Sequence, residues 1–523
     1  MDFFKDIIIW LITIAYSALL IYTTIRILLE NETQTSRTAI YLYAIWILPV
    51  VGFLVYYATG TNRRKQKIYG AKRILDEKQH KESIKIFQNS QKIIADFEKK
   101  FPKFSGLIRL FSHEMISSNN NRVELLINGD ESYNNRVKQF NSYRNSFPAV
   151  LVAQKLSFGT VDYFDSDDEK FEKLKKDLLE AKNHIHLEYY IFEPSQIGDE
   201  IIEILIQKSR KRVRVRFLYD ALGSRYLSEK KIEQMQNAGV EIFPFFELKP
   251  WNFLNRINYR NHRKIVVIDG KIGYVGGINV SDLYVNSIPT HRYGRDTHLK
   301  IDGKSVWDLQ RIFLYDWNFS SEQNLGFDDE LFPDDSEKKY GNALVDITAS
   351  GPDSSYPNIL YALLTGIALS QKEILITTPY FVPNISFLDS LKIAALSGKK
   401  IKLLVPKTYD SKIIELTTQS FFGALLDAGV EIFQYQKGFI HAKTIVYDRE
   451  VSVIGTANLD NRSFDLNFEV NATVYDTDFS QKLAQEFEKD LQDSEKIDPK
   501  TWKNRPFHRK LLGKILNLFA PLM

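Results

Sequence analysis

Two stretches of this 523-residue chain repeat one set of reactive side chains at one spacing. The shared pattern is H-x-K-x4-D, followed downstream by a glycine and, three residues after that glycine, an asparagine. The first copy contains His262, Lys264, Asp269, Gly277 and Asn279, and the second contains His441, Lys443, Asp448, Thr456 and Asn458. A lone histidine in an apolar strand more often has a structural role. Two copies of the whole pattern instead indicate one shared chemical purpose.

An imidazole and an ammonium group placed in this way suit the chemistry of a phosphodiester. Residues two apart on a strand point to the same side, so His262 and Lys264 are expected to share a face, as are His441 and Lys443. If both faces meet in one cleft, one imidazole can attack phosphorus while the other protonates the leaving oxygen and later deprotonates the incoming hydroxyl. The lysines would stabilise the negative charge of the transition state.

The other residues of the pattern are expected to bind substrate or to support the local backbone. We expect Asn279 and Asn458 to hold oxygens of the substrate phosphate. Gly277, and Thr456 at the corresponding position, are also expected to contact substrate, because a small residue lets it approach the backbone. The two aspartates belong to the catalytic pattern, although an aspartate at a predicted hairpin turn more readily braces the turn than touches substrate. The pairs lack a dense cluster of acids, so we expect neither a metal nor another cofactor.

An internal repeat indicates which elements position these residues. The hexapeptide AGVEIF occurs at residues 238–243 and again at 428–433, each time after a helical stretch. Apolar strands are expected further upstream, at 213–218 and 400–405 and, before those, at 184–192 and 374–382. Strands that alternate with helices predict an α/β fold. We therefore expect two halves, residues 120–335 and 336–500, packed as a duplicated α/β sandwich with pseudo-twofold symmetry.

The N-terminal region differs in character from the rest of the chain. Uncharged apolar runs predict two transmembrane helices at about residues 7–27 and 38–60, within a membrane anchor of residues 1–62. A pair of buried core helices is the alternative interpretation. Basic residues directly follow the second run, so the positive-inside rule places both termini and the catalytic body in the cytoplasm. Residues 63–119 are expected to form a helical linker, and the Asn- and Ser-rich residues 117–144 to be irregular.

The C-terminal tail, residues 501–523, has the pattern of an amphipathic helix. Its apolar residues fall on one side, and basic residues lie near the other. Such a helix can lie in the surface of an anionic membrane, or it can pack on the catalytic body, and the sequence leaves both possibilities open.

Composition excludes several classes of protein. The chain has no cysteine, which rules out disulfide frameworks, cysteine-bound zinc and thiol nucleophiles. With 69 basic and 65 acidic residues, its net charge of +4 is too small to indicate a nucleic-acid-binding protein. The two predicted membrane spans favour lipids as partners, and the oligomeric state stays open.

The doubled pattern resembles the phospholipase D superfamily, and the surrounding sequence is similar to bacterial cardiolipin synthases. Residues 295–298, 378–383 and 455–471 carry this resemblance. It implies that two molecules of phosphatidylglycerol react through a phosphatidyl-histidine intermediate to give cardiolipin and glycerol. It also implies that His262 is the nucleophile and His441 the acid and base, with Glu469 orienting His262 and Asp296 orienting His441.

Two features depart from the family pattern. Residues 140–164 look like extra sequence, and Lys211-Arg212-Val213 stands where the family usually has a glycine before a strand.

Other functions also stay open. A phospholipase D, or a phosphatidyltransferase with another alcohol as acceptor, would share the intermediate, whereas a nuclease would not need the membrane spans and a silent scaffold would not need two intact patterns. The expected location is the bacterial cytoplasmic membrane, with several crossings.

Overall fold

The computed structural model describes most of the chain, and the described ranges are as follows. They are residues 2–30, 35–59, 69–70, 72–74, 76, 96, 98–110, 118–127, 169–246, 258–288, 293–333, 340–354, 356–518 and 520. The predicted insertion at 140–164 and most of the predicted linker lie outside these residues.

A single mixed sheet of fifteen strands runs through both halves of the body. In the first half its strands are β1 (Ser118–Ile127), β2 (His184–Tyr189), β3 (Arg214–Tyr219), β4 (Glu241–Pro244), β5 (Lys264–Ile268), β6 (Ile272–Gly276) and β8 (Thr297–Asp302). In the second half they are β9 (Ala343–Ser350), β10 (Glu373–Thr377), β12 (Lys400–Pro406), β13 (Glu431–Tyr435), β15 (Thr444–Tyr447), β16 (Val451–Gly455), β18 (Glu469–Tyr475) and β19 (Ser494–Lys496).

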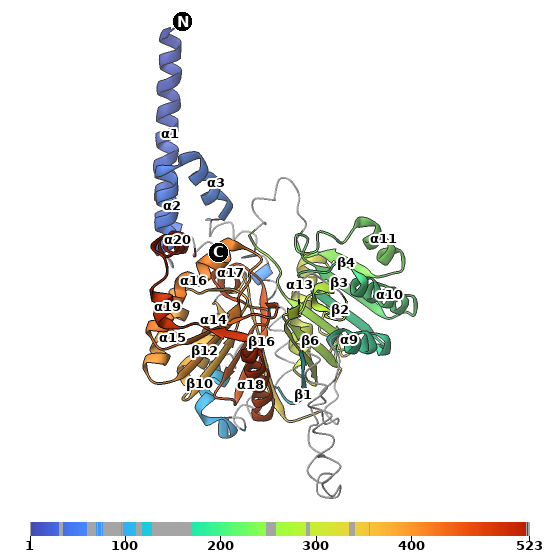
Figure 1. Cartoon of the computed structure of the whole chain (residues 1–523). Helices are drawn as coiled ribbons and strands as arrows, with labels where there is room; N and C mark the ends of the chain where they lie inside the picture. Colours follow the sequence, from blue (N-terminus) through green and yellow to red (C-terminus); the bar gives the residue numbers. More distant parts are fainter. Residues whose placement is uncertain are drawn as a thin grey trace, which may run out of the picture.

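The halves meet where β1 pairs with β9 in antiparallel orientation. Outward from this joint the first half has the order β1-β8-β6-β5-β2-β3-β4, and the second has β9-β18-β16-β15-β10-β12-β13, with β19 at its edge. One apolar core contains side chains of both halves, among them Ile265 and Leu299 of the first and Val446 and Val470 of the second. Figure 1 shows the two halves side by side, the first green and the second orange to red.

Helices cover the faces of this sheet. In the first half they are α9 (Glu169–Glu180), α10 (Gln196–Arg210), α11 (Glu229–Asn237) and α13 (Val306–Ser321). In the second they are α14 (Asn358–Leu369), α15 (Ile385–Leu396), α16 (Lys412–Asp427), α17 (Asn461–Asp465), α18 (Thr477–Gln492), α19 (Pro499–Lys503) and α20 (Phe507–Asn517). The strands β2-β3-β4 and β10-β12-β13 are parallel, as helical crossovers require. The predicted α/β class of the fold is confirmed.

Tight turns close the two hairpins that follow the reactive residues. β5 and β6 are joined at Asp269 and Gly270, whose φ angles are +53° and +63°, and β15 and β16 at Asp448 and Arg449, with +53° and +57°. Two successive residues with positive φ give the turn the twist that antiparallel strands need. Lys264 is the first residue of β5, and Lys443 directly precedes β15.

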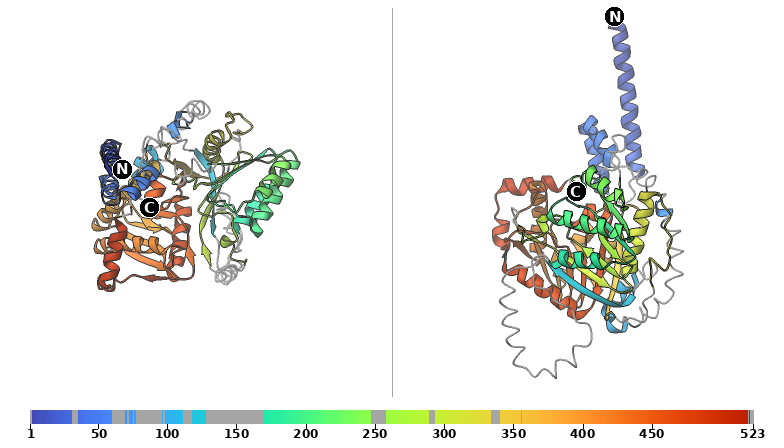
Figure 2. Two further views of the ribbon diagram at one scale, coloured as in Figure 1. Left: turned by 90° about the horizontal axis from the view of Figure 1, so that it is seen from above. Right: turned by 90° about the vertical axis from the view of Figure 1, so that its right-hand side faces the viewer.

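The N-terminal part begins with α1 (Asp2–Glu30), which projects from the body in two of the views (Figures 1 and 2). Within the described residues, one helix is long and apolar enough to cross a membrane, Trp10–Leu28 of α1. The second predicted span is divided into α2 (Thr35–Ile47) and α3 (Pro49–Thr59). Proline lacks the N–H that would continue a helix but fits the first position of a new one, which explains why α3 starts at Pro49.

The strand β1 and the turn at Arg212 differ from what the sequence pattern would suggest. The Asn- and Ser-rich stretch was expected to be irregular, yet residues 118–127 form β1 in the centre of the sheet. At the position where the family usually has glycine, Arg212 has a φ of +67°, a left-handed conformation that glycine adopts without strain. The equivalent turn of the second half uses Gly398, with a φ of +91°.

Between residue 96 and β1, a short helical segment packs on the second half. It contains η1 (Pro102–Phe104) and α6 (Ser105–Leu110), whose Phe104, Leu107 and Ile108 belong to the core around α14. Lys103 also forms ion pairs with Asp448 and Glu450 at the second hairpin.

Candidate active site

Backbone pairing between the halves brings the two reactive histidines into one site. The residue before each histidine pairs with the residue before an acid of the other half: Ile440 of β14 (Phe439–Ile440) with Arg295 of β7 (Gly294–Arg295), and Asn261 with Phe468. The His441 N–H donates to the Arg295 carbonyl at 2.7 Å, and the His262 N–H to the Phe468 carbonyl at 2.9 Å. Each histidine is therefore fixed against the opposite half.

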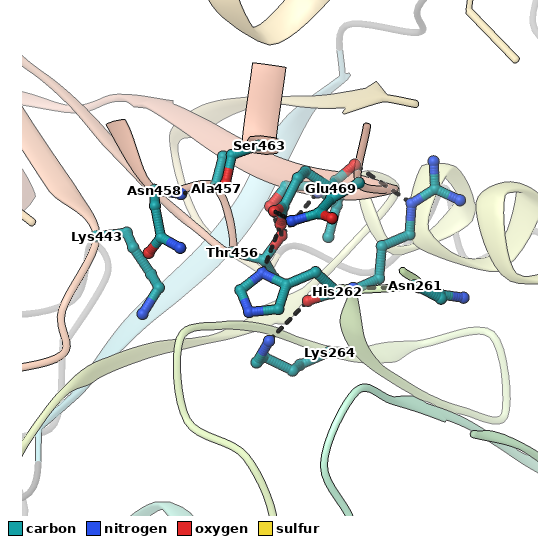
Figure 3. Close-up of polar contacts among 12 residues, drawn as sticks. Asn261, His262, Lys264, Lys443, Thr456, Ala457, Asn458, Ser463 and Glu469 are labelled. Atoms are coloured by element: carbon teal, nitrogen blue, oxygen red, sulfur yellow. Dashed lines mark hydrogen bonds and ion pairs between the residues drawn. The ribbon is translucent and has the colours of Figure 1, made fainter. Parts of the chain in front are cut away.

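The same pairing places a carboxylate against each imidazole. Nδ1 of His262 lies 2.9 Å from Oε2 of Glu469, and Nδ1 of His441 lies 2.7 Å from Oδ2 of Asp296. Figure 3 shows Glu469 against one side of the His262 ring. A carboxylate in this position keeps the proton on Nδ1 and leaves the lone pair on Nε2. The structure thus brings together both pairs that the family resemblance implied, each across the boundary between halves.

The two carboxylates are accommodated in different ways. A side-chain carbon at Gly277 would lie 2.1 Å from Oδ1 of Asp296, so the glycine leaves the room that this aspartate occupies. At the corresponding position, the Thr456 hydroxyl donates to Oε2 of Glu469 at 2.6 Å. Gly277 and Thr456 were expected to contact substrate. In the structure they shape and hold the acids, neither is among the residues that line the cavity described below, and their contact with substrate stays a prediction.

Both lysines are buried beside the histidines. Lys264 donates to the carbonyl of His262 at 2.6 Å, and Lys443 donates to the carbonyl of His441. The Lys443 amine also lies 2.9 Å and 3.0 Å from the two ring nitrogens of His441. In Figure 3 it points from the second half toward the space beside His262. The faces of the two predicted pairs therefore converge.

Burial and mutual repulsion lower the proton affinity of these bases. Burial lowers the pKa of Lys264 to about 7 and that of Lys443 to about 8, and in each case nearby carboxylates oppose the effect. Burial and then Lys443 lower the pKa of His441 to about 4, while burial lowers that of His262 despite the attraction of Glu469. Burial raises the pKa values of Glu469 and Asp296, but the adjacent cationic groups outweigh it and keep both below their usual values. These cationic groups suit the binding of an anion, and a bound anion would raise the pKa values of the lysines and histidines again.

A cavity of about 660 Å³ opens over both histidines. Asn279 and Asn458 line it. Asn279 donates to the Tyr284 hydroxyl at 2.8 Å, whereas Oδ1 of Asn458 is buried without a hydrogen-bond partner among the described residues. An unsatisfied buried amide is costly unless a ligand completes its bonds. The wall toward the opening is apolar, with Leu283, Ile413 and Ile414.

The cavity also contains residues that sequence reasoning missed. Tyr190 and Tyr380 line it, and their rings lie 4.7 Å and 6.4 Å from the imidazoles of His262 and His441, respectively. A signal was present, because the two tyrosines occupy the same position in the repeated strands at 184–192 and 374–382. Arg260 and Arg462 line the cavity as well and have no counterpart in the other half.

Asp269 and Asp448 lie at the far ends of their strands, away from the cavity. Asp269 accepts the backbone N–H groups of residues 182–184, and Asp448 those of residues 371–373. Each aspartate therefore ties its hairpin to the start of the neighbouring antiparallel strand, β2 or β10. Among the described residues, no group of three or more His, Asp or Glu side chains could hold a metal ion.

Comparison with known proteins identifies the family of this chain. The family model "Cardiolipin synthase, PLD-like domain" matches residues 174–317 and 363–491, which is more than half of the chain. The chain belongs to the cardiolipin synthase family. This family consists of phosphatidyltransferases of the phospholipase D type. A second model, of a phospholipase D-nuclease N-terminal region, matches residues 18–60.

Individual cardiolipin synthases are similar over almost the whole length. "Cardiolipin synthase 2" of Bacillus anthracis is 38% identical over 95% of this chain and 88% of its own. The "Major cardiolipin synthase" of Bacillus subtilis is 35% identical over 96% of this chain and 97% of its own. Among solved structures, the phosphatidylserine synthase of Haemophilus influenzae matches with a TM-score of 0.52 at 15% identity, over 68% of this chain and 91% of that one. This last likeness concerns the fold.

Proposed function

We propose that this protein is a cardiolipin synthase that transfers the phosphatidyl group of one phosphatidylglycerol to the glycerol headgroup of another, without a metal. The observation that carries the proposal is the convergence of two buried His/Lys pairs, each with its carboxylate, on one cavity. Membership of the cardiolipin synthase family supports the choice of substrate.

The proposed reaction has two displacements at phosphorus. First, Nε2 of His262 forms a bond to phosphorus, the bond to the headgroup oxygen breaks, and His441 gives that oxygen a proton, so glycerol leaves. Second, a hydroxyl of the acceptor lipid gives its proton to His441 and bonds to phosphorus, and the electron pair of the N–P bond returns to His262. Lys264, Lys443 and the two asparagines would hold the charged oxygens in both steps.

The structure offers a reason to prefer His262 as the nucleophile. Among the described residues, its ring makes a hydrogen bond only through Nδ1, so Nε2 keeps its lone pair for phosphorus. In His441 the amine of Lys443 lies 3.0 Å from Nε2. This amine occupies the lone pair that His441 would need to attack phosphorus, and a bound phosphodiester would raise the pKa of His441 into a range useful for proton exchange. Glu469 and Asp296 are then positioning residues.

The cavity combines features that a phospholipid headgroup needs. Its floor is polar and cationic around the two histidines, while Leu283, Ile413 and Ile414 form an apolar wall nearer the opening. Leu283 and Ile413 are more than half exposed. Such a wall can cover the first carbons of the acyl chains as the headgroup enters from a bilayer.

We further propose that the enzyme crosses the bacterial membrane twice, with its catalytic body in the cytoplasm. α1 supplies the first crossing, and α2 with α3 completes the second. Residues 62–67, NRRKQK, follow α3 and carry four positive charges, which favours the cytoplasmic side. The match of the N-terminal family model to residues 18–60 covers parts of both apolar segments.

The domain boundaries of the chain are also a proposal. We propose residues 1–62 as the anchor, 63–119 as linker, 120–335 and 336–500 as the phospholipase D-like halves, and 501–523 as the tail. The matching strand orders and the two crossed His–carboxylate pairs support pseudo-twofold symmetry between the halves.

The decisive experiment follows the lipid products. Purified full-length protein is incubated in detergent micelles with phosphatidylglycerol labelled in its headgroup glycerol and, separately, in its acyl chains, with EDTA present. We expect labelled cardiolipin and free glycerol in equal amounts. Phosphatidic acid as the sole lipid product would instead assign a hydrolase, and a requirement for added metal would contradict the metal-free mechanism.

Trapping the intermediate tests the roles of the histidines. In acid-quenched wild-type enzyme we expect acyl-labelled lipid bound to the protein, and none in His262→Ala. In His441→Ala the adduct should form only with donors whose leaving group needs no proton, such as a nitrophenyl ester. An adduct that persists in His262→Ala would move the nucleophile to His441.

A further inference from the structure

The proposed reaction brings two phosphodiesters into one cavity. The transferred phosphoryl group occupies the His/Lys centre, where both lysines are required to stabilise it. The acceptor phosphatidylglycerol carries a phosphodiester of its own, separated from the attacking oxygen by three carbon atoms. This second anion stays intact during the reaction and has to lie close to the first. Without a matching positive charge its burial would be costly.

Two arginines of the cavity are not used by the transfer chemistry. Arg260 lies two residues before His262 and is 3% exposed. Arg462 belongs to α17, shortly after Asn458, and lines the same cavity. They come from opposite halves of the sequence, as the two histidines do, yet neither has an arginine at the corresponding position of the other half.

Both arginines act on one side of the cavity, next to the proposed nucleophile. Burial and then Asp220 raise the pKa of the Tyr190 hydroxyl, and the charges of Arg260 and Arg462 both oppose this rise. The Tyr190 ring in turn lies 4.7 Å from the imidazole of His262. Both arginines line the cavity together with Tyr190 and His262, and Arg462 contacts the backbone of Asn258, two residues before Arg260.

The two arginines differ in their protein contacts. Arg462 donates to the backbone carbonyl of Asn258 at 3.0 Å and, among the described residues, forms no ion pair. Nη1 of Arg260 lies 3.3 Å from Oδ1 of Asp220, but this carboxylate also accepts three backbone N–H groups, from Leu222, Gly223 and Asn261. Asp460 also lines the cavity, and burial raises its pKa, which weakens its competition for Arg462.

We propose that Arg260 and Arg462 form a second anion site that binds the phosphodiester of the acceptor lipid and so selects a phospholipid over water or a free alcohol. A guanidinium presents paired donors to phosphate oxygens, which makes arginine better suited than lysine to hold a phosphate that does not react. This inference rests on the proposed function, because it assigns the acceptor of the same reaction.

The test compares two acceptors in the same enzyme. Full-length protein in micelles of phosphatidylglycerol receives labelled glycerol. Its incorporation into phosphatidylglycerol measures transfer to a neutral alcohol, and cardiolipin formation measures transfer to a lipid. For Arg462→Gln we expect the ratio of cardiolipin formation to glycerol incorporation to fall about tenfold or more, equivalent to about 1.4 kcal/mol. Arg462→Lys should fall between the two, because it keeps a charge but loses the paired donors.

A matched variant controls for the loss of one positive charge. Arg225 is exposed, contacts Tyr226 and does not line the cavity, so Arg225→Gln should leave the ratio unchanged. Equal losses of both reactions in Arg462→Gln and Arg260→Lys would overturn the acceptor site and indicate a purely structural role. An unchanged ratio would overturn it as well. If the wild-type enzyme incorporates glycerol but never makes cardiolipin, the proposed function itself fails.

Discussion

The orientation of each catalytic histidine depends on a residue from the opposite half of the protein, outside the repeated pattern that contains the histidine. Each imidazole is oriented by an acid of the other half, and each acid is accommodated by the position that follows the motif glycine, Gly277 or Thr456. Family resemblance was enough to name the acids. It was not enough to place Gly277 and Thr456, because each of them meets its acid only through strand pairing, of β6 with β8 and of β16 with β18.

The lowered proton affinities predict a bell-shaped dependence of kcat/KM on pH. Activity should fall above about pH 7 to 8 as Lys264 and Lys443 lose their charge, because their pKa values are about 7 and 8. It should also fall on the acid side as His262 is protonated, at a pH below its usual 6.5 because burial lowers its pKa. Rates measured at low substrate concentration from pH 4 to 10 would report both limbs.

Lys264→Arg separates the lysine from the other titrating groups. Arginine stays protonated throughout this range, so the alkaline limb should move upward, even though the altered geometry lowers the rate about tenfold. An alkaline limb that stays in place would assign it to another group.

Gly277→Ala should cripple catalysis and leave the fold intact. The added carbon would meet Asp296 at 2.1 Å and push it away from His441. Loss of a partner that orients a catalytic histidine costs about 10- to 100-fold in activity, so we expect kcat to fall by that amount. Gly326→Ala is the control, because no atom lies within 4 Å of the carbon it adds. Equal activities of the two variants, each shown to be folded by circular dichroism, would contradict the role of Gly277.

Strands and turns with a clear sequence pattern were predicted well. Elements whose residues are also frequent in loops were not. The repeated strands and the hairpin turns at Asp269 and Asp448 follow directly from alternation and turn chemistry. β1 was missed because its first residues are Ser and Asn, which are frequent in loops, whereas its pairing with β8 and β9 is a tertiary effect. The second apolar run was expected to be one helix, but it is divided at Pro49 into α2 and α3.

The tail helix α20 combines the two arrangements that the sequence left open. Gly513 is buried against Leu416 and Ser420 of α16, so one side packs on the body. Phe507, Leu512 and Leu518 are exposed, and α20 lies at the end of the body from which α1 projects (Figure 1). An exposed apolar side at that place would meet the membrane surface.

A fluorescent probe can test whether α20 touches lipid. Because the chain has no cysteine, Leu512→Cys carries one environment-sensitive dye. In vesicles that contain phosphatidylglycerol we expect its emission to shift to the blue and to be quenched by brominated acyl chains. The same dye on Glu495→Cys, an exposed residue of β19, should show neither effect. Equal quenching at both positions, or at neither, would count against contact between α20 and the membrane.

At the scale of the whole molecule, the helix α1 and the fifteen-stranded sheet are expected to have different roles, in membrane attachment and in support of the site. α1 holds 29 residues and is about 43 Å long at about 1.5 Å per residue, which exceeds the roughly 30 Å hydrocarbon layer. The sheet continues through both halves and supports the site from below. The enzyme is thus expected to work as a rigid body held at the membrane surface.

Topology can be tested with single cysteines in intact cells. Two crossings place Thr33, between α1 and α2, outside and Lys500, at the start of α19, inside. An impermeant maleimide should therefore label Thr33→Cys in intact spheroplasts and Lys500→Cys only after permeabilisation. Protection of both residues until permeabilisation would indicate a single crossing by α1, and early labelling of Lys500→Cys would reverse the orientation.

The joint between β1 and β9 has a consequence for motion during turnover. Because one sheet and one core unite the halves, the two imidazoles cannot move apart unless strand pairs break. Enzymes that clamp their ligands by hinge closure release products by swinging open, and this route is closed here. In the proposed reaction, glycerol and cardiolipin have to leave through the mouth that admits phosphatidylglycerol. We therefore expect the pace of catalysis to depend on lateral traffic of lipid at that mouth, and hence on the fluidity of the surrounding bilayer.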